Sequence, residues 1–536
     1  MKRLAVLFFL FAVSISIGRE AGAQDGQRPV YVPAEVLVKF RSQAASADIG
    51  SIKSQLGLDT LKIFKRIAAH HLKIRSNLTV AQAISRLRQS PFVEYAEANY
   101  YRYVNAVPND PRYPEMWGLN NTGQTGGTPG ADIDAQAAWN ITTGSANVVV
   151  ALIDSGTDLN HQDLAANIWT NPGEIPGNGI DDDGNGFVDD VHGWDFRDND
   201  NDPTDTSATC SGHGTHTAGT IGALGNNGIG VTGVNWSVKI MPLRVFGGFF
   251  CSGADSQIIS AIEYYSDFGI RFSSNSYGGG PFNQAAMDAI RASKSVYVAA
   301  AGNEGRDNDV TPNYPSNYEL QNIIAVAATD DTDVRAGFSN FGLNSVDLGA
   351  PGVDILSTIP GDNYGLLSGT SMATPHVAGV VGLLLAQDPG LTNLEIRFRI
   401  LRGVDPTGLS VATGGRLNAK NSLVFGLQPP LVEVALTPVG PTTVSPGDAI
   451  SYNLSIQNNG SAAATITAKI YAQGPAGQEA TLHGPVTFSL AGGGSVNQTF
   501  SKTIPTAVGL GSYSIFGQAE TATSFDEDPV AYEIVP

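Results

Sequence analysis

The chain has 536 residues, of which 42% are hydrophobic and 15% charged, and this composition excludes a mainly disordered protein. Its length exceeds that of one typical domain, so we expect two or three domains. The formal net charge of −19 is unevenly placed: residues 24–104 carry about +6 and residues 105–536 about −27. This asymmetry argues against nucleic acid as a partner of the acidic part and favours attraction between the two parts.

The N-terminus has the pattern of a secretory signal peptide. Met1-Lys2-Arg3 precedes an apolar run from Leu4 to Val13, and Ala21-Gly22-Ala23 then supplies a typical cleavage sequence. No later stretch is apolar over the length of a membrane span. We therefore predict a signal peptide at 1–23 and a secreted protein without a membrane span.

Residues 24–104 have the pattern of a small α+β domain, with an additional strand considered near 61–67. The predicted order is strand, helix, strand, helix and strand, over 33–40, 46–57, 69–76, 79–90 and 93–104. A domain of this kind between a signal peptide and an acidic body predicts a prodomain.

Residues 105–427 are predicted to form a doubly wound α/β domain around a parallel sheet. The strands are continuous apolar runs, as expected where both faces of a sheet are covered. They span 147–156, 238–246, 270–280, 295–305 and 322–330, with helices at 252–268 and 282–293. Ligands of this architecture bind at the carboxyl ends of strands, where Asp154, Ser276 and Asn303 fall.

Residues 428–536 form the predicted third domain, after a Gln428-Pro429-Pro430 linker. Runs rich in Val, Thr and Ser alternate between apolar and polar residues and are separated by turn signals such as Asn459-Gly460. This pattern is typical of an all-β immunoglobulin-like sandwich.

Three segments carry residues suited to nucleophilic catalysis. Ser371 begins an apolar helix predicted within 368–386, Asp154 ends a buried strand, and His213 lies in SGHGTHTAG. Taken singly, the serine could cap its helix, the aspartate could be a cap or a metal ligand, and His213 with His216 could form half of a metal site. Together they supply the nucleophile, base and orienting carboxylate of acyl transfer.

These segments make the chain similar to the subtilisin-like serine proteases over roughly residues 108–425. The motifs ALIDSGTDLNHQDL, GHGTHTAG and GTSMATPHVAG follow one another in the order of that family. The resemblance implies that Ser371 attacks the scissile carbonyl, that His213 is the general base, and that Asp154 orients His213. It also implies that Asn303, in AAAGNEG, stabilises the oxyanion beside the Ser371 amide.

The same resemblance extends to substrate binding. NSYGGG is similar to the family's substrate strand, so Ser276, Tyr277 and Gly278 are expected to pair with an extended peptide. The prodomain is similar to inhibitor-like propeptides, which implies intramolecular inhibition and self-cleavage between Tyr100 and Asp110. The partners expected are protein or peptide substrates and the chain's own propeptide, with no nucleic acid and a monomeric state.

The two cysteines, Cys210 and Cys251, leave two alternatives. In an oxidising compartment they form one disulfide most simply, and otherwise they are two buried thiols. Neither lies in a persuasive nucleophile setting. A bridge would brace the rim of the expected substrate cleft.

Calcium is the cofactor implied by the resemblance and by acidic clusters. The family's strong site is expected at Asp110, Asp163, Asn227, Ile229 and Val231. Two further acidic clusters could bind calcium. The first is the loop DDDGNGFVDD, which resembles a calcium loop but has His192 where the last ligand would stand, and the second is the segment WDFRDNDND. The alternative for both is a solvated acidic surface. Their expected ligands are Asp181, Asp183, Asn185 and Asp189, and Asp195, Asp198 and Asp200.

Two other functions compete with a general secreted serine endopeptidase. One is an inert protease-like body that binds a surface together with the β-domain, although all four catalytic positions are filled. The other is a processing protease with one partner, although no acidic lining for paired basic residues is evident in the sequence.

Overall fold

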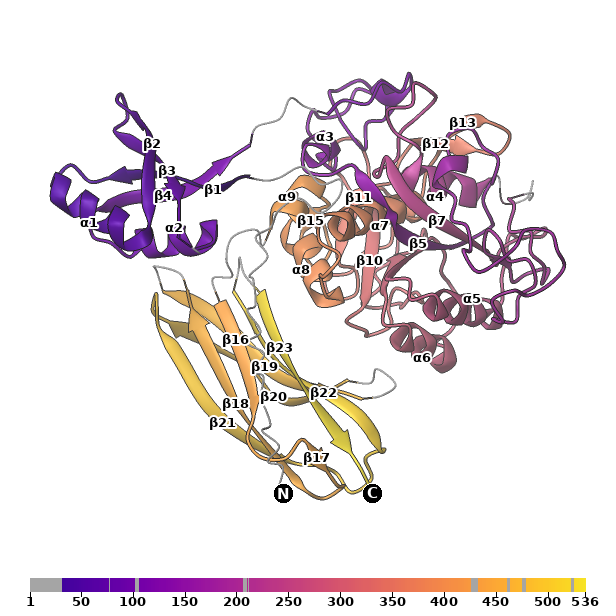
Figure 1. Cartoon of the computed structure of the whole chain (residues 1–536). Coiled ribbons are helices and arrows are strands. Elements are labelled where there is room, and N and C mark those ends of the chain that lie inside the picture. Colours follow the sequence, from indigo (N-terminus) through magenta and orange to yellow (C-terminus); the bar gives the residue numbers. More distant parts are fainter. Residues whose placement is uncertain are drawn as a thin grey trace, which may run out of the picture. The chain divides into compact units, whose positions relative to one another are not determined.

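The computed structural model describes residues 31–76, 78–101, 106–205, 210, 212–425, 432–459, 463–474, 479–521 and 525–536. The chain divides into two compact units, Met1–Tyr103 and Val104–Pro536, and Figure 1 shows the elements of each. The predicted signal peptide, 1–23, lies outside the described residues. None of the described helices combines the length and apolar character that a membrane crossing requires.

The first unit is a four-stranded antiparallel sheet with two helices. The strand order is β2-β3-β1-β4, and the strand considered near 61–67 is β2. Val36 and Val38 of the central strand pack with Ala83 and Leu87 of the second helix in one core. The elements are β1 (Tyr31–Phe40), α1 (Ser46–Leu56), β2 (Leu58–Phe64), β3 (Ala69–Ile74), α2 (Val80–Arg88) and β4 (Val93–Tyr100). The predicted small α+β domain is therefore confirmed, with β2 as its additional strand.

A nine-stranded sheet organises the second unit, in the order β14-β15-β11-β10-β9-β8-β5-β7-β6. All its strand pairs are parallel except β14–β15, which confirms the predicted parallel sheet. The strands are β5 (Gly144–Asp154), β6 (Trp194–Asp195), β7 (Ser237–Arg244), β8 (Phe272–Asn275), β9 (Val296–Ala300), β10 (Ile323–Thr329), β11 (Leu348–Pro351), β14 (Asp405–Pro406) and β15 (Gly415–Arg416). In the sheet β5 lies between β7 and β8, and the chain crosses from one side of β5 to the other between β7 and β8, so β5 and β8 flank a topological switch point.

Helices cover both faces of this sheet. Along β5, Val150 and Leu152 enter a core shared with α4 and α7, whereas Ala151 and Ile153 enter a core shared with α5 and α6. This alternation is the period of two expected of a strand buried on both faces. The helices are α3 (Ala135–Trp139), α4 (His213–Gly222), α5 (Asp255–Asp267), α6 (Gln284–Ala292), α7 (Thr370–Gln387), α8 (Asn393–Arg402) and α9 (Ala419–Val424).

Helix α7 is the central helix of this unit, and its residues are buried without a break from Met372 to Ala386. Pro375 lies inside this helix rather than in its first turn, and the Ser371 carbonyl, which has no amide at position 375 to accept, accepts the Ser276 hydroxyl instead. Smaller elements complete the unit, namely η1 (Tyr113–Glu115), η2 (Ala165–Asn167) and the hairpin β12 (Ile355–Ile359)–β13 (Asn363–Leu367). The apolar sequence predicted to be buried on all sides is thus the core helix.

The described residues from 432 onwards form two sheets, β16-β18-β21 and β17-β23-β22-β19-β20. Val434 and Leu454 of the first sheet share one core with Ile466 and Ile515 of the second. The strands are β16 (Val432–Pro438), β17 (Thr443–Val444), β18 (Ala449–Asn458), β19 (Ala464–Gln473), β20 (Glu479–Leu490), β21 (Ser495–Thr503), β22 (Gly511–Glu520) and β23 (Phe525–Ile534).

Candidate active site

The carboxyl end of β5 and the start of α4 bring Asp154 and His213 together. His213 Nδ1 lies 2.7 Å from Asp154 Oδ1, and Asp154 is only 3% exposed. The Thr217 hydroxyl donates to Asp154 Oδ2 at 3.0 Å, and the Ser155 amide donates to Oδ1 at 2.7 Å. These contacts hold the carboxylate and engage Nδ1 of the imidazole, which leaves Nε2 for another group.

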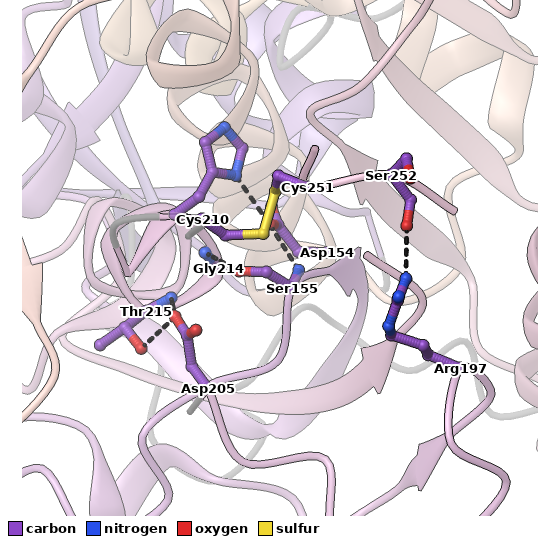
Figure 2. The surroundings of a disulfide bond; sticks show 10 residues. Asp154, Ser155, Arg197, Asp205, Cys210, Gly214, Thr215, Cys251 and Ser252 are labelled. Atoms are coloured by element: carbon purple, nitrogen blue, oxygen red, sulfur yellow. Dashed lines mark hydrogen bonds and ion pairs between the residues drawn. A yellow bond between two sulfur atoms is a disulfide. The ribbon is translucent and has the colours of Figure 1, made fainter. Parts of the chain in front are cut away.

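A second buried carboxylate, Asp205, lies near this pair. Its Oδ2 accepts hydrogen bonds from the amide (3.2 Å) and hydroxyl (2.9 Å) of Thr215, as Figure 2 shows. Its Oδ1 is buried and has no hydrogen-bond partner within the described ranges. Burial, together with the charge of Asp154, raises the pKa of Asp205 to about 6. The sequence analysis did not identify this residue, because no motif included it.

Opposing effects act on the pKa of His213. Burial lowers this pKa, whereas the charge of Asp154, its hydrogen bond and the charge of Asp205 raise it, and the net shift is upwards. The site therefore stabilises the protonated form of His213 relative to a histidine in water. A base that must carry a proton between nucleophile and leaving group benefits from that stabilisation.

Ser371 lies in the first turn of α7 and contacts the segment that follows β8. Its hydroxyl donates to the Ser276 carbonyl at 3.1 Å, and the Ser276 hydroxyl donates to the Ser371 carbonyl at 2.9 Å. Both residues are described, and no hydrogen bond joins Ser371 to His213 in this structure. Catalytic hydrogen bonds of free enzymes are often long and tighten when substrate binds. The structure thus brings Asp154 and His213 into contact but directs the serine hydroxyl to Ser276.

Two N–H groups face the same small space beside Ser371. Asn303 Oδ1 accepts hydrogen bonds from the amide (2.8 Å) and hydroxyl (2.9 Å) of Thr370, so its Nδ2 is directed elsewhere. A Cβ built on Gly369 would lie 3.5 Å from the Ser371 amide nitrogen and 3.7 Å from Asn303 Nδ2. Neither donor has a hydrogen-bond partner among the residues that the structure describes. Two free donors around one point are what an oxyanion requires.

The segment expected to bind substrate, Ser276–Gly278, continues directly from β8. Ser276 is buried, while Tyr277 is half-buried and Gly278 exposed. The Tyr277 ring packs on Phe246 at 4.9 Å between centroids, and its hydroxyl contacts that of Tyr297. Within the described chain, the backbone groups of Tyr277 and Gly278 make no hydrogen bonds. Their amide and carbonyl groups are therefore free to pair with an extended peptide.

A disulfide joins Cys210 to Cys251, with a Cα–Cα distance of 5.2 Å (Figure 2). It connects the residue three positions before His213 to the loop after β7. Arg197 Nη1 also donates to the Ser252 carbonyl at 2.7 Å, which adds a second tether to this loop. The bridge thus restrains the start of α4 as well as the loop.

The expected family calcium site gathers two buried carboxylates around one loop. Asp163 accepts from Asn227 Nδ2 (2.7 Å) and the Val231 amide (2.9 Å), and Asp110 accepts the Asn227 amide (3.1 Å). The Ile229 amide donates to Asn227 Oδ1 at 2.7 Å. Burial raises the pKa of Asp163, with a contribution from the charge of Asp110. The two carboxylates lie on either side of Asn227 and are oxygen ligands of the kind that calcium prefers, and N–H groups of Asn227 and Val231 hold them in this structure.

In the cluster Asp195, Asp198 and Asp200, an arginine contacts two of the three expected calcium ligands. Arg244 Nη1 contacts Asp195 Oδ2 and lies 2.9 Å from Asp198 Oδ2. Asp200 Oδ1 accepts the Asp202 amide at 3.1 Å. The guanidinium already supplies the positive charge that these carboxylates require.

In the preceding loop, two of the expected ligands, Asp181 and Asp189, have backbone partners in the structure. Asp189 accepts the amides of residues 177–179, and Asp181 accepts those of residues 184–186, so both carboxylates cap backbone turns. Asp183 instead converges with Glu174 and Asp190, and Asn185 Nδ2 donates to both aspartates. The spacing of a calcium loop does not predict Glu174 or Asp190 as ligands. Glu174 precedes the loop, and Asp190 directly follows Asp189, which the spacing predicts as a ligand.

The chain matches the Subtilase family over residues 145–426, which is more than half of its length. This chain belongs to the subtilase family. The fold, with a parallel sheet and Asp154, Ser276 and Asn303 at the carboxyl ends of its strands, is consistent with that membership. Residues 19–99 match the Fervidolysin N-terminal prodomain, so the subtilase carries a prodomain of that class.

Named relatives of this subtilase are proteases. The Thermophilic serine proteinase of Bacillus sp. (strain AK1) is 33% identical over 79% of this chain and 100% of its own. Thermitase of Thermoactinomyces vulgaris is 40% identical over 55% of this chain and 94% of its own. A solved structure titled as proteases from Pseudoalteromonas arctica is 29% identical, with a TM-score of 0.49, and covers 60% of this chain and 99% of that one. The subtilase is thus a serine endopeptidase by family.

Proposed function

We propose that this subtilase is a secreted endopeptidase that hydrolyses proteins and peptides through Ser371, His213 and Asp154. The observation that carries the proposal is the Asp154–His213 contact at 2.7 Å together with the two free N–H donors beside Ser371. A weak hydroxyl nucleophile needs a base, an orienting group for that base and donors for the oxyanion, and these residues supply all of them.

The reaction begins when substrate binding turns the Ser371 hydroxyl from the Ser276 carbonyl towards His213 Nε2. Oγ attacks the scissile carbonyl carbon while Nε2 accepts the hydroxyl proton, and Asp154 stabilises the imidazolium. The Ser371 amide and Asn303 Nδ2 donate to the oxyanion. His213 then protonates the leaving amine, and water repeats the sequence to release the acyl group.

The substrate backbone is proposed to lie along Ser276, Tyr277 and Gly278. The free and partly exposed backbone groups of Tyr277 and Gly278 support addition of an extended strand, which binds main chain without demanding one sequence. This mode suits a protease of broad specificity rather than a processor of one partner.

Domain boundaries and processing are part of the proposal. The regions are a signal peptide (1–23), a propeptide (24–104), a peptidase domain (105–427) and a C-terminal domain (428–536). The propeptide would act as an intramolecular inhibitor, released by self-cleavage between Tyr100 and Asp110. The charge of about +6 on residues 24–104 against about −27 on the remainder supports this association. The mature enzyme is proposed to be a secreted monomer.

The C-terminal domain is proposed to be immunoglobulin-like, since a three-stranded and a five-stranded sheet share one core. Calcium is proposed at Asp110 and Asp163, with oxygen ligands from Asn227, Ile229 and Val231. The ion supplies positive charge that holds this loop and takes no part in peptide hydrolysis.

Self-processing tests the proposal directly. Wild-type chain and Ser371→Ala are expressed in parallel with calcium, and each is followed by intact mass and N-terminal sequencing. We expect wild type to lose about the first hundred residues and Ser371→Ala to retain its propeptide. If both proteins remain full length, the proposed activity fails, and surface binding by an inert protease-like body becomes the better explanation.

A further inference from the structure

The connection between β5 and α4 holds a group of acidic side chains apart from the proposed catalytic residues. One carboxylate oxygen each of Glu174, Asp183 and Asp190 lies within 4.8 Å of the others. Asp190 is fully buried and Glu174 is 8% exposed, whereas Asp183 is exposed. Three acidic groups therefore converge where one side remains open to water.

Neutral donors surround this group. Asn171 Nδ2 lies 2.9 Å from Asp183 Oδ2 and 2.8 Å from Asp190 Oδ1, and the Tyr264 hydroxyl donates to Asp190 Oδ2 at 2.6 Å. Across the part of the chain that the structure describes, no Lys, Arg or His forms an ion pair with the three carboxylates. Buried carboxylates without a countercharge are costly, so the arrangement favours binding of a cation from solution.

Glu174 supplies an independent indication of such a ligand. Its Oε1 accepts the amides of Asp182 (2.9 Å) and Asp183 (3.3 Å). Its Oε2 is buried and has no hydrogen-bond partner among the described residues. An acceptor oxygen left without a donor, beside two further carboxylates, is what a bound cation would satisfy.

We propose that Glu174, Asp183 and Asp190 bind a calcium ion. All three ligands are hard oxygen donors, and calcium holds such oxygens at 2.3–2.6 Å in a flexible geometry. Oxygens up to 4.8 Å apart can lie on opposite sides of an ion of that size, and Asp183 provides the path to solvent. Water completes the coordination. The proposal is independent of catalysis by Ser371.

The ion would fix the connection between Asp154 and His213 to the rest of the domain. Tyr264 belongs to α5, and its ring lies 5.0 Å from that of Phe187 in the same connection. Calcium would thereby tie residues 171–190 to α5 through Asp190. We expect binding to slow local opening of this segment.

The test counts calcium ions on the full-length Ser371→Ala chain, which avoids self-cleavage, by native mass spectrometry. Glu174→Gln and Asp190→Asn should each lose one ion. Asp181→Asn is the matched control, because its carboxylate lies in the same loop but accepts backbone amides. Asp163→Asn reports on the other proposed site, so a Glu174→Gln/Asp163→Asn chain should lose two ions. An unchanged ion count in Glu174→Gln, or loss in Asp181→Asn alone, would overturn the proposal.

Hydrogen exchange provides a second readout that needs no ligand variant. Calcium should slow amide exchange of residues 171–190 in the Ser371→Ala chain, and Glu174→Gln should abolish this slowing. If Glu174→Gln does not fold, exchange of the Ser371→Ala chain with and without calcium still tests the site, because that chain retains all three proposed ligands. Calcium-dependent protection around residues 226–231 with none in 171–190 would refute the site while leaving both the catalytic proposal and the Asp163 site intact.

Discussion

Two buried aspartates, Asp154 and Asp205, flank the beginning of α4 and differ in their partners. Asp154 faces His213 Nδ1 at 2.7 Å, whereas Asp205 is held by the hydroxyl and amide of Thr215. Their exposed fractions are nearly the same, 3% and 4%. Burial therefore does not distinguish the proposed catalytic carboxylate from its neighbour; the group that each carboxylate contacts does.

The contrast also explains which residues could be predicted from sequence. Asp154 and His213 stand at the ends of regular elements inside recognisable motifs, and parallel strands bring such ends together. The same reasoning located Ser371 and the central helix α7, because a continuous apolar run specifies a core helix without any knowledge of its partners.

The partners of the acidic residues could not be predicted from the sequence, because they lie far away along the chain. Asp195 lies in an acidic segment that predicts a calcium ligand, and its partner in the fold is Arg244, 49 residues later. Glu174 was overlooked because its neighbours in the fold, Asp183 and Asp190, follow it after a series of turns. Acidic spacing indicates that a cation is needed, but only the fold determines whether an arginine supplies it.

The largest expected difference between the two aspartates is in rate. In Asp154→Asn the amide favours the wrong tautomer of His213, so the first-order rate of self-cleavage of the full chain should fall about 10⁴-fold. Asp205→Asn is the matched control and should remain within about tenfold of wild type. Both rates are followed by intact mass over time. Equal losses in the two variants would show that the aspartates share one role.

A second expected difference is in stability. The pKa of Asp205, raised by burial from 3.8 to about 6, corresponds to about 3 kcal/mol. Because the pKa of Asp205 is higher in the folded state, only the unfolded chain loses this proton between about pH 4 and pH 6. The free energy of unfolding is therefore unaffected by Asp205 below about pH 4 and falls as the pH rises to about 6. In a Ser371→Ala background, Asp205→Asn should remove that loss.

Denaturant unfolding at fixed calcium, followed by tryptophan fluorescence, measures this effect. All five tryptophans lie between residues 117 and 236, so the signal reports on the peptidase domain. The free energy of unfolding of the parent, relative to Asp205→Asn, should fall between pH 4 and pH 6. A difference that does not change over this interval would exclude Asp205 as the titrating group.

The smallest expected effect is on the acidic limb of the pH–rate profile. The negative charge of Asp205 helps to raise the pKa of His213 against the opposing effect of burial. Asp205→Asn should therefore move the acidic limb of kcat/KM to lower pH, by about a few tenths of a unit. Because Asp205 is buried, added salt should leave most of the difference between variant and wild type in place. A shift towards higher pH would contradict the assigned electrostatics.

Covalent labelling shows directly whether Ser371 is the nucleophile. Wild-type protein, incubated with calcium until its mass is stable, is treated with a serine-reactive fluorophosphonate and digested for peptide mass mapping. We expect one adduct, on Ser371, and none on that peptide in Ser371→Ala. Absence of an adduct from the processed wild type, or an adduct only on another residue, would contradict catalysis by Ser371.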